Sequence, residues 1–343
     1  MSEPANRSHV VVETDPVALV PSYEDLNAEE RHYVGKARAA NTLRGYRSDW
    51  KEWCAWCSQA GVDPLPAAPA AISQYLAFLA SHGAKVGTMR RRISALRFAH
   101  RLHQQSDPTD HPRVIAVWEG IQRDHKDTPD QAAPLMPPDL IDVIDHCPTV
   151  RTWKSDRTDE PDLAGYRDRA LLAVGFFAAL RRSEIANIRL GDFEQRSRGL
   201  VLHIPRSKTN QSGDQDELVA LPHLSDARLD PIAHLNNWCR HAGIREPDAL
   251  VFRSVDRHNR VGASLTGTAI NALVKRAIQR TGLDPTPYSA HSLRAGFVTY
   301  AHLRGPSDRA IAHQTRHGSL ASVGTYVRVE EIFEDNAVTQ LGL

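Results

Sequence analysis

The stretch from Tyr288 to Leu303, "YSAHSLRAGFVTYAHL", combines an apolar helical pattern with basic side chains. His291 and Arg294 are three residues apart, so both would lie on the same face of a helix. An imidazole and a guanidinium that converge in this way suit an anion such as a phosphate. An ordinary buried polar pair would be the favoured explanation if no other reactive side chains accompanied them.

Further reactive side chains lie before and after this stretch in the second half of the chain. They are Arg181, Arg182 and Glu184 in "ALRRSEI", Lys208 in a predicted hairpin, and His317 and Tyr326 in "RHGSLASVGTYVR". The chain has no GxxxxGK[ST] loop, HExxH helix or GxSxG elbow. Nucleotide hydrolysis, zinc proteolysis and α/β-hydrolase chemistry therefore lack their signatures.

Arginine, histidine, lysine and tyrosine side chains together fit phosphoryl transfer without a metal ion. Two guanidiniums can neutralise the charge that builds on a five-coordinate phosphorus, because each binds two non-bridging oxygens. A tyrosine hydroxyl, with a pKa near ~10, becomes a usable nucleophile when nearby cations stabilise its phenolate. A lysine or histidine can protonate the departing alkoxide. The phosphotyrosine ester keeps the energy of the broken bond, so we expect resealing without ATP and no cofactor.

Length and composition are those of an ordinary globular protein with room for two domains. Hydrophobic residues make up 41% and charged residues 24% of the 343 residues, and no segment approaches the ~18 apolar residues of a membrane span. We therefore expect a cytoplasmic protein. The formal net charge of +1 hides a basic body, because residues 1–30 carry −6 and residues 329–343 carry −4, leaving +11 for residues 31–328. A basic body suits a polyanionic partner.

The first half is predicted to be helical after an acidic tail, residues 1–22, that we expect to be disordered. Helical periodicity, broken at Gly and Pro, predicts helices at 23–39, 42–61, 69–82, 87–104 and 112–125 in a domain spanning residues 23–126. Basic side chains on the second and fourth of these helices could bind a DNA phosphate backbone, although a solvated surface is an equal alternative for the fourth. The candidate DNA contacts are Thr42, Arg44, Arg47, Arg90, Arg91, Arg97 and Arg101.

Residues 127–137 are rich in proline and have no apolar period, so we predict a linker there. Helices are expected beyond it at 138–145, 165–188, 231–241, 265–280, 292–304, 307–313 and 319–326. The stretches "LVLHIPRSK" and "ELVALP" predict two strands of one hairpin. The expected fold class is mainly α with a small antiparallel β-sheet: an N-terminal all-helical domain and a C-terminal mixed α+β domain over residues 138–343.

The spacing of Cys54 and Cys57 matches the C-x-x-C pattern of redox and zinc sites. The surrounding sequence has helical periodicity with Trp50, Trp53 and Trp56, and no second Cys or His pair follows at finger spacing. Buried core cysteines are therefore the favoured interpretation.

The stretches "ALRRSEIANIRLGDF", "AHSLRAGF" and "HGSLASVGTYVR" resemble the three signature boxes of the tyrosine recombinases, or phage integrase family, in the family's order. The match is specific: Arg-x-Ser-Glu, then His-x-x-Arg, then a His nine residues before a Tyr. "NTLRGYRSDWKEWCAWC" and the helices after it resemble the family's core-binding domain. The resemblance covers about residues 23–343, and the chain length, acidic end and N-terminal helices look most like the Cre-like members.

The resemblance implies a site-specific DNA recombinase, an enzyme that cleaves and rejoins duplex DNA through a 3′-phosphotyrosyl intermediate and a Holliday junction. Arg181 and Arg294 would clamp the scissile phosphate, and His291 would accept and donate a proton beside it. Lys208 would protonate the 5′ oxygen, and Tyr326 would attack the phosphorus.

Two further residues and the assembly also follow from the resemblance. His317 would bond a phosphate oxygen, and Glu184 occupies the acidic position that supports the site. The expected partners are duplex DNA with an inverted-repeat site and a homotetramer on synapsed DNA. The stripe of Phe333, Ala337 and Leu341 near the end of the chain would pack on its own domain or, as in Cre-like members, dock on a neighbouring protomer.

Three of these assignments have a plain alternative. Arg182 could face the phosphate instead of Arg181, but adjacent helical residues point ~100° apart and the family spacing favours Arg181. Lys208 could be a solvated turn residue. Glu184 could be an ordinary helix salt-bridge partner.

The nucleophile and the function have alternatives as well. Tyr288 and Tyr300 compete with Tyr326, and the distance of Tyr326 from His317 favours Tyr326. A non-catalytic DNA-binding regulator could keep the same fold, and a type IB topoisomerase-like enzyme could share the chemistry. All six active-site positions are filled, which argues against a regulator.

Overall fold

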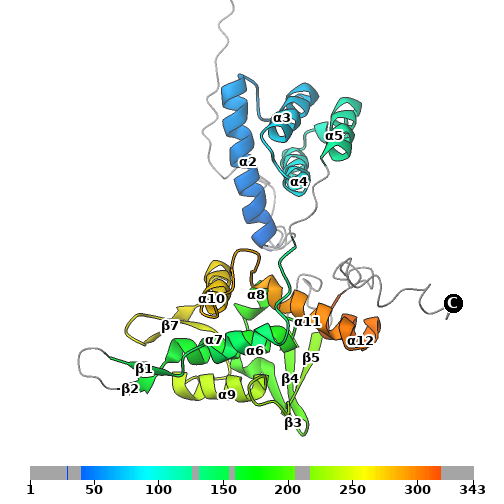
Figure 1. The fold of residues 1–343 in the computed structure, drawn as a ribbon. Coiled ribbons are helices and arrows are strands. Elements are labelled where there is room, and N and C mark those ends of the chain that lie inside the picture. The colour runs from blue at the N-terminus through cyan, green and yellow to red at the C-terminus, as the bar shows by residue number, and fades with distance from the viewer. Residues whose placement is uncertain (1–28, 30–39, 126–130, 154–158, 205–216, 318–343) are drawn as a thin grey trace, which may run out of the picture. The chain divides into compact units, whose positions relative to one another are not determined.

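The chain forms two compact units, residues 1–129 and 130–343, in the computed structural model (Figure 1). The structure describes residue 29 and residues 40–125, 131–153, 159–204 and 217–317. Each unit has a hydrophobic core of its own.

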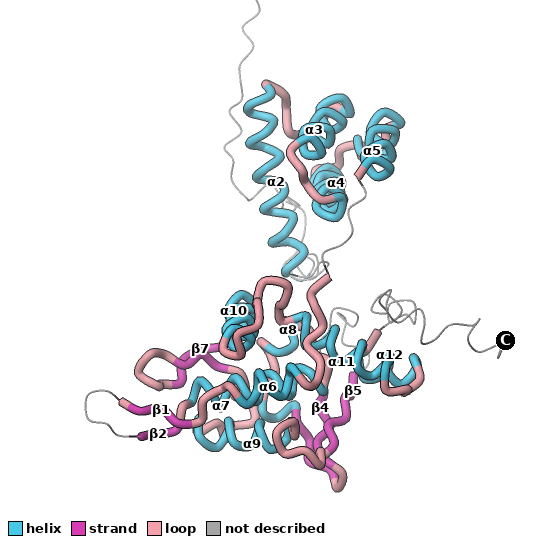
Figure 2. The backbone as a smooth tube through the Cα atoms, viewed as in Figure 1, coloured by secondary structure: helices cyan, strands magenta, loops and turns pink. Residues whose placement is uncertain are grey.

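The described part of the first unit is helical. Its helices are α2 (Ala40–Ala60), α3 (Pro69–Ser81), α4 (Val86–Leu102) and α5 (Pro112–Asp124), with a 3₁₀ turn, η2 (Pro108–Asp110), before α5. Four predicted helices are thus confirmed to within two residues at each end, and the predicted helix 23–39 lies outside the described residues. Proline opens both α3 and α5, where the N–H it lacks would have had no partner inside the helix. Helix α2 packs on α4, and α3 packs on α5 (Figure 2).

Aromatic side chains form the centre of the first core. Trp53 is fully buried, with its ring centroid 5.5 Å from that of Trp56 and 5.0 Å from that of Tyr75. Cys57 is buried beside them, and the loss of hydration raises the pKa of its thiol to about 12. Such a thiol is neither a ready nucleophile nor a metal ligand. The interpretation of the C-x-x-C pair as core residues is therefore confirmed for Cys57, and the half-buried Cys54 packs against the same core.

The second unit is built around one apolar helix, α7. It is surrounded by α6, α9, α10 and α11, while α12 packs on α11 (Figure 1). These helices are α6 (Asp139–Asp145), α7 (Leu163–Phe177), α9 (Pro231–Ala242), α10 (Gly267–Gln279), α11 (His291–Leu303) and α12 (Asp308–Thr315). Ten of the fifteen residues of α7 are buried, which is the pattern of a helix covered on nearly all sides. No helix within the described ranges is long and apolar enough to cross a membrane.

The strands of the second unit form more sheets than the single hairpin predicted from the sequence. The predicted hairpin strands are β4 (Gly199–Ile204) and β5 (Glu217–Pro222), and β3 (Phe193–Arg196) adds an antiparallel third strand, in the order β3-β4-β5. Two more pairs are antiparallel: β1 (Val150–Thr152) with β2 (Asp159–Pro161), and β6 (Arg253–Val255) with β7 (Val261–Ser264). Strands of three or four residues contain too few alternations for a period of two to be visible.

The predicted helix 165–188 is wrong as a single element. Helix α7 ends at Phe177, and a short helix, α8 (Arg182–Ile185), follows after a break in which Ala179 has a left-handed φ of 46°. Only glycine adopts this conformation freely, and no glycine marks the break in the sequence. The reason lies in tertiary structure. After the end of α7, the carbonyl oxygens of Ala178 and Ala179 accept hydrogen bonds from arginines elsewhere in the unit.

The described half of the predicted linker packs on the second unit. Leu135 is fully buried in the second core, and its N–H donates to the carbonyl of Ser292 at 3.0 Å. The N–H of Ala133 donates to the carbonyl of Pro287 at 2.9 Å. The proline-rich sequence has no apolar repeat, so the sequence alone did not indicate this contact. Residues 131–137 are therefore an extended strap on the second unit rather than a free linker.

Gly296 permits this strap to approach α11, and a methyl group at this position should destabilise the second unit. A Cβ atom at residue 296 would lie 2.1 Å from the carbonyl oxygen of Leu135, which is a backbone atom that cannot rotate away. Gly296→Ala is expected to cost about 3 kcal/mol of unfolding free energy, the upper end for overpacking. Thermal unfolding of the full chain should then begin roughly 6–12 °C lower.

Gly120 in α5 is the matched control for this substitution. A Cβ atom at residue 120 would meet nothing within 4 Å, so Gly120→Ala should stabilise its helix by up to about 1 kcal/mol. Equal melting temperatures for Gly296→Ala and the unmodified protein would contradict the close approach of the strap.

Candidate active site

The C-terminal end of α7 binds the guanidinium of Arg294. Arg294 is 1% exposed, and its Nη1 donates to the carbonyl oxygen of Ala179 at 2.7 Å. Carbonyls at a helix C-terminus carry partial negative charge and attract cations. The break after α7 thus fixes one arginine of the predicted phosphate clamp.

The second arginine of the predicted clamp, Arg181, caps the N-terminus of α8 and is oriented by Glu184. Arg181 Nη1 donates to Glu184 Oε1 at 2.8 Å, and the backbone N–H of Arg181 donates to Glu184 Oε2 at 2.8 Å. The Glu184 carboxylate is 2% exposed, so this pair is shielded from water. Glu184 is therefore a salt-bridge partner, and the arginine that it orients is the predicted phosphate ligand.

His291 is the first residue of α11, one turn before Arg294. Its backbone N–H donates to Ser289 Oγ at 3.1 Å, which fixes the start of the helix. The residue is exposed, yet partial desolvation of the ring and the positive charges of Arg294 and Arg181 lower the pKa of His291. A neutral imidazole beside two arginines can accept a proton at physiological pH.

His317 follows α12 and faces the same charges. Its Nδ1 lies 2.7 Å from Thr315 Oγ1, which holds the ring in one orientation. Desolvation is the largest cause that lowers the pKa of His317 to about 4, and Arg294 and Arg181 add to it. Arg181 Nη2 donates to the carbonyl oxygen of Arg316, the residue before His317, at 3.3 Å, and both arginines lower the pKa of both imidazoles. Arg181, His291, Arg294 and His317 therefore lie in one group.

The side chain of Arg182 lies beside the start of α10. Arg182 is exposed, and a Cβ atom on Gly267 at the start of α10 would lie 2.8 Å from Arg182 Nε. The assignment of Arg181 rather than Arg182 as the phosphate ligand stays a prediction. Lys208 and Tyr326 lie outside the described residues.

A third arginine, Arg316, belongs to the same group and was not predicted from the sequence. It is 8% exposed, and its Nη2 donates to Glu184 Oε2 at 2.7 Å. The one feature of the sequence that could have indicated Arg316 is its position directly before His317.

Acidification should destabilise the second unit between about pH 6.5 and pH 4. An unfolded chain binds a proton at His317 near pH 6.5, whereas the folded chain does so only near its lowered pKa of about 4. The contribution of the neutral imidazole to stability is therefore complete above pH 6.5 and is lost as the pH falls through this window. Urea unfolding of the full chain at several pH values measures this loss.

His317→Asn keeps a polar side chain beside Thr315 and removes the titrating group, so its stability should fall less steeply over the same window. His313→Asn, at an exposed position of α12, is the control and should keep the steep slope. Equal slopes for the unmodified protein and His317→Asn would contradict the assignment.

The candidate DNA contacts of the first unit differ in how they are held. Arg44, Arg47, Arg90 and Arg101 are exposed, as phosphate contacts require. Arg101 also pairs with Asp107 at 3.5 Å, and two others have internal ion pairs. Arg91 Nε lies 2.8 Å from the buried Asp49 carboxylate, and Arg97 binds acidic residues around η2. These two side chains therefore also hold their helices together.

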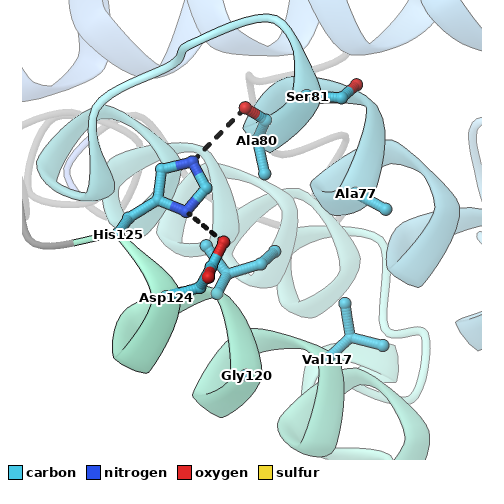
Figure 3. A pocket seen from close by; sticks show the side chains of 8 residues that line it. Ala77, Ala80, Ser81, Val117, Gly120, Asp124 and His125 are labelled. Atoms are coloured by element: carbon cyan, nitrogen blue, oxygen red, sulfur yellow. Dashed lines mark hydrogen bonds and ion pairs between the residues drawn. The ribbon is translucent and has the colours of Figure 1, made fainter.

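A groove of about 490 Å³ lies between α3 and α5 of the first unit (Figure 3). Its walls are mostly small and apolar side chains, among them Ala77, Ala80 and Val117. The one imidazole at the groove, His125, lies 3.3 Å from the carbonyl oxygen of Ala80. None of the predicted reactive residues lines this groove, so it carries no part of the chemistry.

Two family models match the chain. The Phage integrase family model covers residues 155–331, and the model of the phage integrase N-terminal SAM-like domain covers residues 32–104. The first match includes every residue assigned to catalysis, and the second includes the candidate DNA contacts.

Proteins of similar sequence carry the names of recombinases. An integrase/recombinase xerD homolog from Selenomonas ruminantium is 30% identical over 328 residues, which cover 94% of this chain and 92% of the relative. The recombinase cre of Escherichia phage P1 is 25% identical over 245 residues, 67% of each chain. The similarity to the xerD homolog is thus higher and longer, and the expected closeness to Cre is not supported by these values.

Solved structures share the fold. The post-cleavage complex of the XerH site-specific recombinase with a palindromic difH substrate has a TM-score of 0.62 at 15% identity, covering 92% of this chain and 82% of that one. A lambda integrase dimer bound to a COC′ core site has a TM-score of 0.55 at 14% identity, covering 87% and 74%.

Proposed function

The chain belongs to the phage integrase family, and from this membership we propose that it is a site-specific tyrosine recombinase in which Tyr326 attacks a DNA phosphate held by Arg181 and Arg294. The observation that supports the proposal best is the convergence of these two guanidiniums on two imidazoles of lowered pKa. A phosphodiester would supply negative charge beside these cationic side chains, of which Arg181 already has a carboxylate partner in Glu184.

Cleavage would exchange one phosphodiester bond for another. Tyr326 Oη forms a bond to phosphorus, the bond from phosphorus to the 5′ oxygen breaks, and the 3′ end remains attached to the enzyme. His291, neutral at physiological pH, takes the phenol proton, and Lys208 gives a proton to the leaving 5′ oxygen. His317 bonds a non-bridging oxygen. Attack by the 5′ hydroxyl of another strand reverses these transfers, so strand exchange consumes no ATP.

The assembly and the domain roles are part of the same proposal. Residues 23–126 would bind DNA, with Thr42, Arg44, Arg47 and the arginines of α4 on phosphates, and residues 138–343 would carry catalysis. Two protomers would bind an inverted repeat, and two such sites would synapse as a homotetramer and exchange strands through a Holliday junction. The stripe of Phe333, Ala337 and Leu341, which lies outside the described residues, would dock on the neighbouring protomer as in Cre-like members.

A covalent trap tests the chemistry. The protein first selects its site from a library of random duplexes. The selected duplex is then nicked near the cleavage position, so that cleavage releases a short strand with a free 5′ hydroxyl, which diffuses away and cannot reseal the break. We expect a protein–DNA adduct that survives denaturing electrophoresis and forms equally in the presence of EDTA. Failure of the unmodified protein to form an adduct on a duplex that it binds tightly would favour the non-catalytic regulator.

Plasmid relaxation separates a recombinase from a topoisomerase. A recombinase should leave a supercoiled plasmid without the selected site largely unrelaxed, because cleavage depends on a bound and synapsed site. Rapid relaxation of such a plasmid would favour the type IB topoisomerase-like alternative.

A further inference from the structure

Arg316 has an unusual backbone conformation for an arginine. It ends α12 with φ 57° and ψ 47°, in the left-handed region. Residues other than glycine are uncommon in this region and persist there when the surrounding contacts over-determine them. The side chain of Arg316, 4% exposed, makes contacts that account for its conformation.

The guanidinium of Arg316 is bound on several sides. Nη1 donates to the carbonyl oxygens of Ala178 and Gln314, both at 3.1 Å. Nη2 donates to Glu184 Oε2 at 2.7 Å and to the carbonyl oxygen of Ala179 at 3.4 Å. Nε lies 3.4 Å from Glu217 Oε2. The Nε contact with Glu217 is an ion pair without a hydrogen bond. The Nη1 and Nη2 donors of a planar guanidinium can bind the other four oxygens together, whereas the ammonium of a lysine cannot.

These acceptors are shared with both arginines of the proposed clamp. Glu184 accepts from Arg181 on its other oxygen, and Ala179 accepts from Arg294. The backbone carbonyl of Arg316 itself accepts from Arg181 Nη2 at 3.3 Å. Arg316 thus shares hydrogen-bond acceptors with Arg181, through Glu184, and with Arg294, through Ala179.

Two neighbours of Arg316, one in sequence and one in space, adjoin the segments that contain Tyr326 and Lys208. His317 is its neighbour in sequence, at the start of the segment that leads to Tyr326. Glu217 is the first residue of β5, directly after the segment that contains Lys208. The side chain of Arg316 therefore contacts α8 and the first residue of β5, and its backbone directly precedes His317.

The charge of Arg316 also acts on the groups that hold the clamp. Glu184 lies between Arg181 and Arg316 and is neutralised by both. Without Arg316, the carboxylate would act on Arg181 alone and reduce the positive potential offered to a phosphate. In a buried group of this kind, removal of one cation leaves the carboxylates with less compensating charge.

We propose that Arg316 is a positioning residue for DNA cleavage, which fixes the orientation of Arg181 and Arg294 and prevents Glu184 from neutralising the phosphate clamp. The inference rests on the proposed recombinase function. The competing explanation is a purely structural ion pair that anchors α12 to α7 and β5. The two explanations differ in the cleavage rate of the folded protein.

The test is the single-turnover rate of adduct formation on the selected, nicked duplex at saturating protein. Arg316→Gly removes the side chain and relieves the left-handed backbone, and we expect cleavage roughly 10- to 100-fold slower, because one organising charge of the site is lost. The dissociation constant for the duplex should stay within about twofold, because phosphate contacts elsewhere dominate affinity. Arg316→Lys should be slowed as well.

Arg309→Ala, at an exposed position of the same helix, is the control and should cleave at the unmodified rate. Far-UV circular dichroism and the melting temperature establish that each variant is folded at the assay temperature. Cleavage by folded Arg316→Gly and Arg316→Lys at the unmodified rate would overturn the inference. Since the unmodified protein forms the adduct in the same assay, that outcome would leave the recombinase function standing, whereas no adduct from the unmodified protein would remove both.

Discussion

Replacing Tyr326 by phenylalanine is expected to abolish the covalent protein–DNA adduct and to leave binding of the selected duplex unchanged within about twofold. The phenol oxygen is the one atom that the substitution removes, and it is the atom proposed to bond to phosphorus. Phenylalanine has no group that can replace it. Denaturing electrophoresis of the trapped complex and a binding titration on the same duplex measure the two effects separately.

Tyr300 and Tyr288 provide matched controls in the second unit. Tyr300 Oη accepts a hydrogen bond from Arg304 Nε at 3.2 Å at the end of α11, and Tyr288 packs at the edge of the second core. Tyr300→Phe and Tyr288→Phe should therefore form the adduct at close to the unmodified rate. Survival of the adduct in Tyr326→Phe, or its loss in one of the controls, would show that another tyrosine is the nucleophile.

The helices of this fold could be predicted from the sequence because they follow local rules. In the first unit, apolar residues recur at helical spacing and prolines stand at the starts of α3 and α5, so the boundaries agree to within two residues. Similar punctuation marks α9, which begins at Pro231 and ends before Gly243 in a left-handed conformation.

The break between α7 and α8 could not be predicted in this way, because its cause lies more than one hundred residues along the chain. The sequence at Ala178, Ala179 and Leu180 continues the apolar helical pattern without a glycine. Arg294 and Arg316 bind the carbonyls at this break. Such contacts override local propensity, and only the folded arrangement reveals them.

The same distinction applies to the site. Arg181, His291, Arg294 and His317 could be proposed because their spacing matches a family pattern, while Arg316 follows no spacing rule that phosphate chemistry requires. Its importance comes from burial and from carbonyls and carboxylates on other elements. Residues that organise a site through others are therefore the ones that sequence patterns miss.

The second large effect is expected at Arg294, where alanine should slow single-turnover cleavage by about 10³-fold, the loss for a principal charge-stabilising donor. Arg294 is almost completely buried, and its bond to Ala179 leaves the guanidinium little freedom to turn. In the proposed mechanism, the positive charge would thus be pre-positioned where negative charge develops on phosphorus. Arg294→Lys keeps the charge but cannot make both contacts, so a loss of about 10²-fold is expected.

Arg182→Ala separates this effect from a general loss of positive charge near the site. Arg182 is exposed beside α10, so its removal lowers the same net charge without touching the clamp, and cleavage should stay within about twofold of the unmodified rate. A loss below tenfold for Arg294→Ala, with the protein folded, would exclude Arg294 as a phosphate ligand in the transition state. An equal loss in Arg182→Ala would mean that net charge, rather than the orientation imposed by α7, governs cleavage.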